Sequence, residues 1–190
     1  MTYCSYTGKN NKIKVAQRDI MWRKVALIIV ALIAVTFSTA QTYGGYSLYQ
    51  NYRFGYYLRY PNYMDITSQS GNGDGVAMHS YDKSISISVG AMFNLFNDST
   101  YNLMSENVSS YRSKGYSITY SYINDDYIVL SGYTPSGKIY YLKEVVCTIY
   151  SPGYEEYVEI IASAYMECSL KDKSKGDDII KQFQYFPFKP

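Results

Sequence analysis

The chain has a single histidine, His79, which lies between Met78 and Ser80 on an expected strand. A hydrolytic triad needs such a base next to a nucleophile and an orienting acid. Neither a Gly-x-Ser-x-Gly motif nor a Cys-His signature surrounds His79. We therefore predict a partly exposed sheet residue at this position and no catalytic residue.

The segment Ser70-Gly71-Asn72-Gly73-Asp74-Gly75 has the spacing of a calcium-binding loop, with Ser in the first ligand position. The glutamate that closes such a loop would fall at position 81, which is Tyr. A tight turn of Asn, Asp and Gly explains the same residues. One histidine and two separated cysteines are poor material for zinc, and no nucleotide-binding glycine motif follows a strand. We expect no metal ion and no cofactor.

Three pairs of adjacent acids could serve acid–base catalysis if they faced one cleft. Adjacent residues of a strand point to opposite faces, and two of the pairs lie at expected turns, so turn formation or helix capping is the preferred interpretation. The alternative is an exported hydrolase with carboxylate chemistry. The pairs are Asp125-Asp126, Glu155-Glu156 and Asp177-Asp178.

Tyrosine is the unusual component, with 25 residues, of which 23 follow residue 40. Many alternate with Ser or Thr, as on the strands of a sheet, and sheet propensity alone accounts for that pattern. The alternative is a tyrosine-bearing sheet face that stacks on sugar rings or holds a partner chain, because tyrosine brings a large rigid area at low entropic cost. The candidate ligand-binding residues are Tyr56, Tyr60, Tyr116, Tyr120 and Tyr122.

Positive charge is concentrated at the N-terminus. Residues 1–40 hold six Lys/Arg and one acid, a net charge of +5, whereas residues 41–190 hold twelve and fifteen, a net charge of −3. A mildly acidic domain argues against nucleic-acid binding, which needs clustered positive charge. The apolar run 25–37 follows Arg23-Lys24 and precedes small residues before Gln41, which predicts a secretory signal peptide, with Met21 as an alternative start. An uncleaved membrane anchor is the alternative, and periplasmic or extracellular export is expected.

After the leader we expect a flexible entry segment over 41–50 and a single domain over 51–190. Alternation predicts strands over 53–60, 76–80, 85–93, 116–122, 127–133, 138–150 and 156–167. Helices are expected from Asp98 to about Lys114 and after Asp177, which would cap the second helix. Tyr101, Met104, Val108 and Tyr111 would form the apolar face of the first helix. The class is α+β with a mainly antiparallel sheet of about seven strands.

The last two long strands are expected to form a hairpin, which separates Cys147 from Cys168 by roughly ten residues along a strand. That distance is about 33 Å, far beyond the reach of a disulfide. We therefore expect Cys147 to be a buried apolar residue between Val145 and Ile149.

Two stretches together resemble the opening of small exported bacterial proteins with a PsbP-like fold: a strand of the type "RFGY…YP", then an "NGDG" turn. The resemblance covers roughly residues 51–186 and implies an α-β-α sandwich, whose broader relatives are accessory or adaptor proteins that bind and do not catalyse. It therefore implies a non-enzymatic accessory or binding protein. Together with the tyrosine-bearing face, this predicts an unknown protein or glycan partner in the envelope; a purely structural envelope protein is a further alternative. The matching residues are Arg53, Phe54, Gly55, Tyr56, Tyr60 and Pro61, followed by Asn72, Gly73, Asp74 and Gly75.

Overall fold

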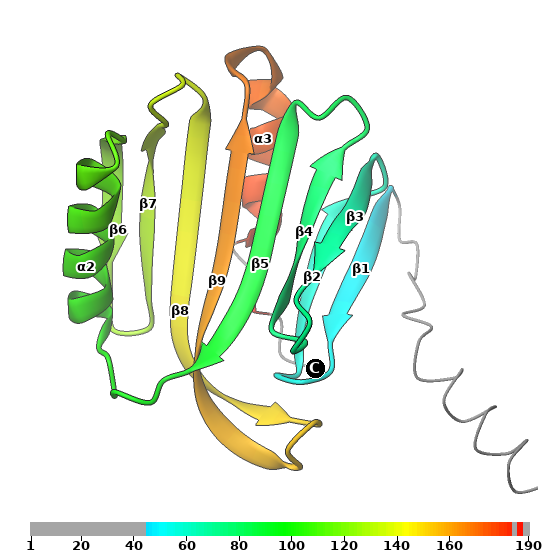
Figure 1. The fold of residues 1–190 in the computed structure, drawn as a ribbon, viewed down its shortest axis with the longest axis vertical. Coiled ribbons are helices and arrows are strands. Elements are labelled where there is room, and N and C mark those ends of the chain that lie inside the picture. The colour runs from blue at the N-terminus through cyan, green and yellow to red at the C-terminus, as the bar shows by residue number, and fades with distance from the viewer. Residues whose placement is uncertain (1–44, 184–185, 188–190) are drawn as a thin grey trace, which may run out of the picture. The chain divides into compact units, whose positions relative to one another are not determined.

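The computed structural model describes residues 45–183 and 186–187, and Figure 1 shows their arrangement. The first strands are β1 (Tyr46–Asn51), β2 (Tyr56–Pro61), β3 (Met64–Gln69), β4 (Gly75–Ser80) and β5 (Ile85–Phe93). After α2 (Thr100–Ser113) follow β6 (Ser117–Ile123), β7 (Tyr127–Tyr133), β8 (Ile139–Ser151) and β9 (Glu156–Cys168). The short 3-10 helix η1 (Leu170–Asp172) and α3 (Lys173–Phe183) complete the described part. The expected signal peptide and the alternative anchor lie outside these residues.

Seven of the described strands form one sheet in the order β3-β4-β5-β9-β8-β7-β6, and all its pairs are antiparallel. The strands β1 and β2 form a separate antiparallel hairpin. The α+β class and the mainly antiparallel sheet are therefore confirmed. The expected strand over 53–60 corresponds to β2, which lies in the separate hairpin and not in the main sheet, and β1 and β3 are additional to the expected strands.

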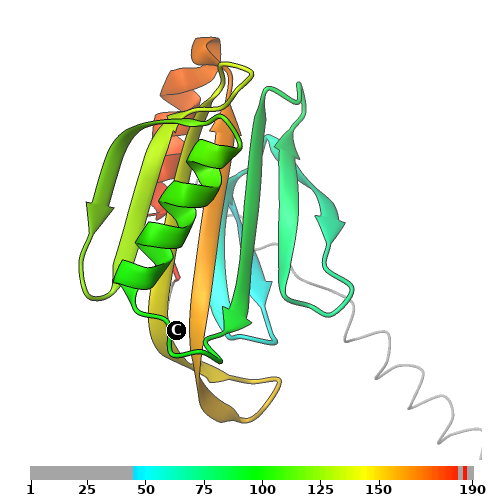
Figure 2. The same ribbon diagram turned by 60° about the vertical axis from the view of Figure 1, so that its left-hand side comes forward.

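The two faces of the sheet carry different elements, as Figures 1 and 2 show. Helix α2 covers one face at the β6–β8 end, and α3 with the β1–β2 hairpin covers the other. Alternation along β9 serves both faces, because Ala162 and Ala164 are buried in the core under α3, whereas Ile161 packs with Leu103 of α2. The larger apolar cluster lies on the α3 side and joins the hairpin, β4, β5, β9 and α3.

The two edge strands of the sheet each contain a β-bulge. The register of β3 shifts between Ile66 and Ser68, and that of β6 shifts between Ile118 and Tyr120. Each bulge adds one residue, Thr67 or Thr119, which has no partner position on the neighbouring strand. Side chains on the two sides of a bulge no longer follow one simple alternation, and this changes where the tyrosines of β6 point.

The N-terminal expectations need two corrections. Residues 46–50 do not form a loose entry segment, because they belong to β1 and pair with β2 along its whole length. Residues 64–69 form β3, although only turn chemistry was expected between Ser68 and Gly75. The side chains of β3 are mostly exposed, so this edge strand lacks the apolar alternation that would have revealed it.

Both helix starts also differ from the expectation. Ser99, not Asp98, caps α2, and its side chain accepts a hydrogen bond from the Asn102 amide at 3.3 Å. Leu103 is the buried anchor of that helix, whereas Tyr101 is exposed. Helix α3 begins at Lys173, so Asp177 lies inside it and does not cap it. Ser169 and η1 provide an earlier start that the sequence pattern did not show.

The strands β8 and β9 form the expected antiparallel hairpin. Cys147 lies opposite Ile160 and Cys168 lies opposite Ile139, so the two cysteines sit at different levels of the hairpin. Val145 and Ile149 flank Cys147 on the same face and are buried, but Cys147 itself is half-buried, so the expectation of a buried residue is corrected. In the described part of the chain, the helices are too short or too polar to cross a bilayer.

Candidate functional site

The five candidate tyrosines do not share one surface. Tyr56 and Tyr60 of β2 are buried, with the Tyr56 side chain fully enclosed. The Tyr56 ring packs edge-on against the ring of Phe186 and in a tilted arrangement against that of Tyr49. Because they belong to the core, the expectation that they form part of a ligand-binding face is corrected.

The bulge in β6 separates the remaining three. Tyr116 lies on the α2 side, where its ring meets Tyr111 and Tyr140 at centroid distances of 4.9 and 5.2 Å. Beyond Thr119, Tyr120 and Tyr122 pair with Ser131 and Val129 and point to the opposite face. A strict alternation would place all three together, so the extra residue is the reason that the expectation fails for Tyr116.

Tyr120 and Tyr122 line an open hollow of about 330 Å³ on the α3 side of the sheet. We call it the tyrosine groove, and its lining comes from three neighbouring strands. Tyr120 and Tyr122 are 53% and 42% exposed, and the rings of Tyr122 and Tyr127 lie 5.5 Å apart. The lining residues are Tyr120, Tyr122, Tyr127, Val129, Tyr141 and Lys143.

A buried cation forms part of the floor of the groove. The Nζ atom of Lys143 donates hydrogen bonds of 2.9 Å to the carbonyl oxygens of Phe183 and Phe186. Phe183 is the last residue of α3, where backbone carbonyls lack helical partners, and Phe186 lies three residues farther along the chain. The same Nζ lies 4.9 Å from the centre of the Tyr127 ring, and burial lowers the pKa of Lys143. The lysine therefore links the groove to the end of α3.

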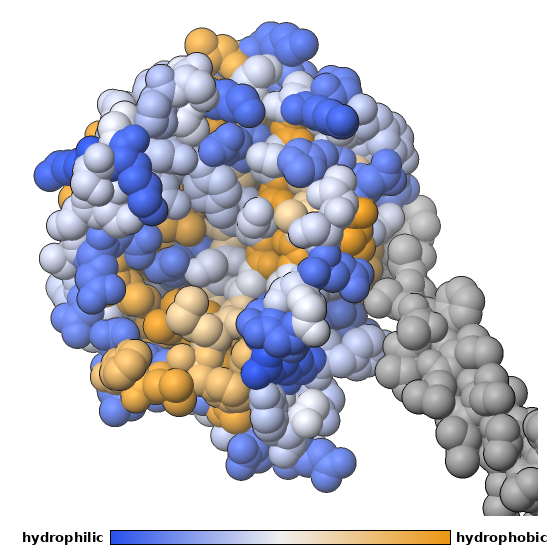
Figure 3. Space-filling view, in the orientation of Figure 1, coloured by the Kyte–Doolittle hydropathy of each residue, from blue (hydrophilic) through white to orange (hydrophobic). Residues whose placement is uncertain are grey.

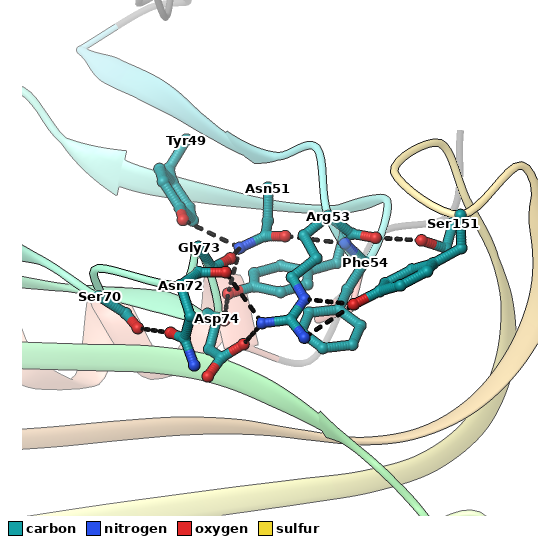
Figure 4. A network of polar contacts seen from close by, with 11 residues as sticks. Tyr49, Asn51, Arg53, Phe54, Ser70, Asn72, Gly73, Asp74 and Ser151 are labelled. Atoms are coloured by element: carbon teal, nitrogen blue, oxygen red, sulfur yellow. Dashed lines mark hydrogen bonds and ion pairs between the residues drawn. The ribbon is translucent and has the colours of Figure 1, made fainter.

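The two motifs that carry the family resemblance meet in space, as Figure 4 shows. The guanidinium of Arg53 forms an ion pair with Asp74 and donates to the carbonyl oxygen of Asn72 at 2.9 Å. Its Nε and Nη2 atoms donate to the Tyr154 hydroxyl at 3.0 and 2.8 Å. Arg53 thus joins the β1–β2 turn, the β3–β4 turn and the β8–β9 hairpin.

Asn51 adds a second link between the same turns. Its amide donates to the Gly73 carbonyl at 2.8 Å, and its side-chain oxygen accepts from the Phe54 backbone amide at 2.9 Å. Gly55 has a positive φ of 71°, and a side chain there would overlap the Tyr150 carbonyl oxygen. These contacts give the motif residues a structural role, because they link the β1–β2 turn, the β3–β4 turn and the β8–β9 hairpin. We call the linking residues the motif cluster (Asn51, Arg53, Asn72, Asp74 and Tyr154).

The oxygens of the calcium-like loop already have partners. The carboxylate of Asp74 pairs with Arg53, and the side-chain oxygen of Asn72 accepts from Ser70. No group of three or more His, Cys, Asp or Glu among the described residues could hold a metal ion. His79 contacts the Thr67 hydroxyl through Nδ1 at 2.9 Å, on the sheet surface.

The acidic pairs expected from the sequence do not converge on a cleft. Asp177 and Asp178 form ion pairs along α3 with Lys173 and Lys181, and Glu155, with a positive φ of 56°, lies in the β8–β9 turn. These positions fit turn formation and helix surface charge.

Sequence reasoning missed a different acid, Glu144 of β8. It accepts hydrogen bonds from Asn107 of α2 and Ser163 of β9 at 2.8 and 2.9 Å. Burial raises the pKa of Glu144, with a smaller contribution from nearby Glu106. In the sequence, Lys143-Glu144 interrupts an apolar strand. Adjacent residues of a strand point to opposite faces. This pair could therefore have indicated one charged side chain on each face of the sheet.

Sequence reasoning also missed Tyr127, Tyr141 and Lys143 as groove residues, because they come from strands that follow the candidate strand in the chain. A search with protein-family models finds no family that matches this chain. A search of curated proteins also finds no match.

Proposed function

We propose that this protein is an exported, non-enzymatic binding domain that holds a glycan chain in the tyrosine groove. The observation that carries the proposal is the position of four tyrosines from three strands on one open hollow of the sheet. Two of them, Tyr120 and Tyr122, are substantially exposed to solvent.

The chemistry of the groove suits a sugar chain. A sugar ring presents flat C–H surfaces and many hydroxyl groups, and a phenol offers a flat ring and a hydroxyl that donates and accepts. Ligand sites combine such aromatic surface with a few fixed polar groups. Lys143 fixes the floor beneath the rings through its bonds to the end of α3.

We propose binding without catalysis because the described lining residues of the groove are tyrosines, a valine and a lysine, with no carboxylate among them. Hydrolysis of a glycosidic bond ordinarily uses two carboxyl groups that flank it. The acid with a raised pKa, Glu144, belongs to the α2 side, since its neighbour Leu142 packs there and its partner Asn107 lies on α2.

The PsbP-like relationship is part of the same proposal. It is supported by the order of elements, in which hairpins, a helix, a long meander and a terminal helix follow one another. The contact between Arg53 and Asp74 supports it further, because it gives the two separated motifs a shared structural reason. Export rests on the leader, and mass spectrometry of the mature protein should give a chain that starts at Gln41.

The glycan proposal is tested by titrating the purified full chain with soluble cello- and chito-oligosaccharides and measuring affinity by calorimetry. We expect binding that Tyr122→Ala weakens roughly tenfold, the size of a lost contact worth about 1.4 kcal/mol. Tyr157→Ala is the matched control, because Tyr157 is 75% exposed on β9 outside the groove. No binding of either sugar series, or equal losses in both variants, would contradict the proposal.

The same mixtures distinguish binding from hydrolysis. After long incubation, we expect the chain lengths of the oligosaccharides to be unchanged when they are measured by mass spectrometry. Shortened products that disappear in Glu144→Gln would overturn the non-enzymatic proposal and favour carboxylate hydrolysis.

A further inference from the structure

The connection between β5 and α2 inverts the usual distribution of polar and apolar residues. Asn94 is buried, whereas its neighbours Leu95 and Phe96 are 77% and 85% exposed, and Met92 is 60% exposed. We call Met92, Leu95 and Phe96 the apolar patch. Figure 3 shows apolar surface gathered beside the end of β5 and over its connection to α2. Single exposed apolar residues are ordinary, but a contiguous group marks an interaction site.

The exposure of these side chains is fixed by the local structure. The Asn94 amide nitrogen donates to the Asp98 carbonyl and to the Glu159 carboxylate at 3.1 Å each. The Asn94 side-chain oxygen accepts from the Asp98 backbone amide at 2.8 Å. Asn97 has a φ of 52° in the left-handed region, which asparagine tolerates better than most residues. The connection therefore presents Leu95 and Phe96 in a preorganised form, which lowers the entropic cost of binding.

Two adjoining hollows of about 300 Å³ each extend the patch across the sheet, since both are lined by Met92, Asp98 and Ile161. The first continues toward Phe54 and Arg53, and the second continues along α2. Apolar side chains of a bound segment therefore have places to enter on both sides of Met92.

The charges around the two hollows are unbalanced. Arg53 is the one cation among the described lining residues, and it forms an ion pair with Asp74. The remaining lining carboxylates are Asp98, Glu106 and Glu144. Glu144 receives hydrogen bonds from the neutral groups of Asn107 and Ser163. The surface thus combines apolar anchors with excess negative charge, and electrostatic complementarity requires a partner that combines apolar side chains with positive charge.

We infer that the apolar patch and its two hollows dock a cationic, partly apolar polypeptide segment of a partner protein. Leu95 and Phe96 supply the central apolar contact, and the carboxylates of Asp98 and Glu106 select lysine or arginine beside it. An anionic lipid surface does not fit the same charges, because the carboxylates repel it. The inference is independent of the tyrosine groove, which lies on the other face of the sheet.

The test measures binding of two synthetic peptides to the purified full chain by fluorescence anisotropy, one of alternating Leu and Lys and one of alternating Leu and Glu. We expect the Leu/Lys peptide to bind. The double variant Leu95→Ser/Phe96→Ser should weaken it at least about tenfold, as loss of a central apolar anchor does. Glu106→Gln should weaken it about threefold at low salt, with a smaller effect at high salt.

The matched control is Leu170→Ser, because Leu170 is 61% exposed in η1, outside both hollows. Equal binding of the two peptides, or unchanged binding in the double variant, would overturn the inference. Co-sedimentation with phosphatidylcholine vesicles that depends on Leu95 and Phe96, without peptide binding, would overturn it in favour of a membrane surface. Tyr122→Ala should leave peptide binding unchanged, which separates this inference from the glycan proposal.

Discussion

Two groups of tyrosines lie on opposite faces of strands β6 to β8, and they have different environments. On the α2 side, four rings form what we call the inner cluster, with centroid distances of 4.9 to 6.3 Å between neighbours. On the α3 side, the tyrosines of the groove surround an open hollow. The inner cluster is Tyr111, Tyr116, Tyr140 and Tyr165, and the groove tyrosines are Tyr120, Tyr122, Tyr127 and Tyr141.

The difference shows that residue type does not decide the role of a tyrosine here. Helix α2 covers the inner cluster and contributes Tyr111 to it, whereas α3 packs over β2, β9 and β8 and leaves the groove open. The bulge at Thr119 places Tyr116, just before β6, on one face, and Tyr120 and Tyr122 of β6 on the other. The inner cluster should therefore determine stability, and the groove should determine binding.

Alkaline pH should produce the largest effect, because it acts on all the buried phenols together. Burial raises the pKa of Tyr140 to about 12, from an ordinary value of 10.0. The folded state then holds a proton that the unfolded state has lost, so the free energy of unfolding should fall as pH rises through 10 toward 12. Two pKa units correspond to about 3 kcal/mol for this one residue, and burial also raises the pKa of Tyr111 and Tyr165.

Urea unfolding followed by circular dichroism between pH 10 and 12 measures this loss of stability. Lys143 acts with the opposite sign, since burial lowers its pKa and the unfolded state binds the extra proton below pH 10.5. One lysine cannot offset several tyrosines, so a stability that stays level between pH 10 and 12 would contradict the assignment of a stabilising inner cluster.

Tyr140→Ala is the strongest single test of the inner cluster. The Tyr140 side chain is fully buried among three other rings, and its removal should lower the free energy of unfolding by about 4 kcal/mol. Its hydroxyl is buried with no hydrogen-bond partner in the described part of the chain. Tyr140→Phe should therefore raise the free energy of unfolding slightly, by less than about 1 kcal/mol. Chemical denaturation of both variants checks the pair, and a large loss in Tyr140→Phe would show that the hydroxyl is bonded.

Gly132→Ala should disturb the bulge that places Tyr116 on one face of the sheet and Tyr120 and Tyr122 on the other. Gly132 of β7 lies opposite Ile118, next to the bulge, and a side chain there would overlap the Ser117 carbonyl oxygen. Because this neighbour is backbone, the bulge must shift, at a cost of about 2 kcal/mol. Gly90→Ala is the control, since a side chain on that glycine of β5 would make only ordinary contacts. Equal stability of the two variants in denaturation curves would show that β6 tolerates the change.

The smallest effect on stability should come from the groove. Tyr120→Ala and Tyr122→Ala should each change the free energy of unfolding by less than about 0.5 kcal/mol, as substitutions of exposed side chains usually do. Thermal unfolding measures this, with Tyr140→Ala as the contrasting variant. A large loss of stability in Tyr122→Ala would remove the distinction between the two groups.

The sequence predicted the parts of the fold that depend on regular alternation. The strand over 85–93 and the β8–β9 hairpin have clear period-two patterns, from which the bounds of the first and the antiparallel pairing of the second follow. β3 was missed because an exposed edge strand buries little and needs no such pattern. The start of α3 was misplaced because Asp177 has the chemistry of a cap but sits inside a helix that begins at Lys173.

The candidate site was less predictable, for a physical reason. Tyr120 and Tyr122 were identified, but Tyr116 was grouped with them because alternation does not reveal a bulge. Gly132 was the available signal, since a glycine within a strand often marks the close approach of another backbone. Tyr127 and Tyr141 join the groove through pairing between strands, which depends on the register of the whole meander.

The two bulges also affect whether copies of this protein can associate through the edges of their sheets. A regular edge strand offers free backbone groups on which another sheet can grow, and this is a route to aggregation. Here β3 and β6, the two ends of the seven-stranded sheet, each carry a bulge, which locally twists the strand and interrupts its ladder of backbone groups. The same extra residue that separates Tyr116 from Tyr120 and Tyr122 thus protects an otherwise exposed sheet edge. A variant that straightens β6 would therefore lose solubility as well as its groove.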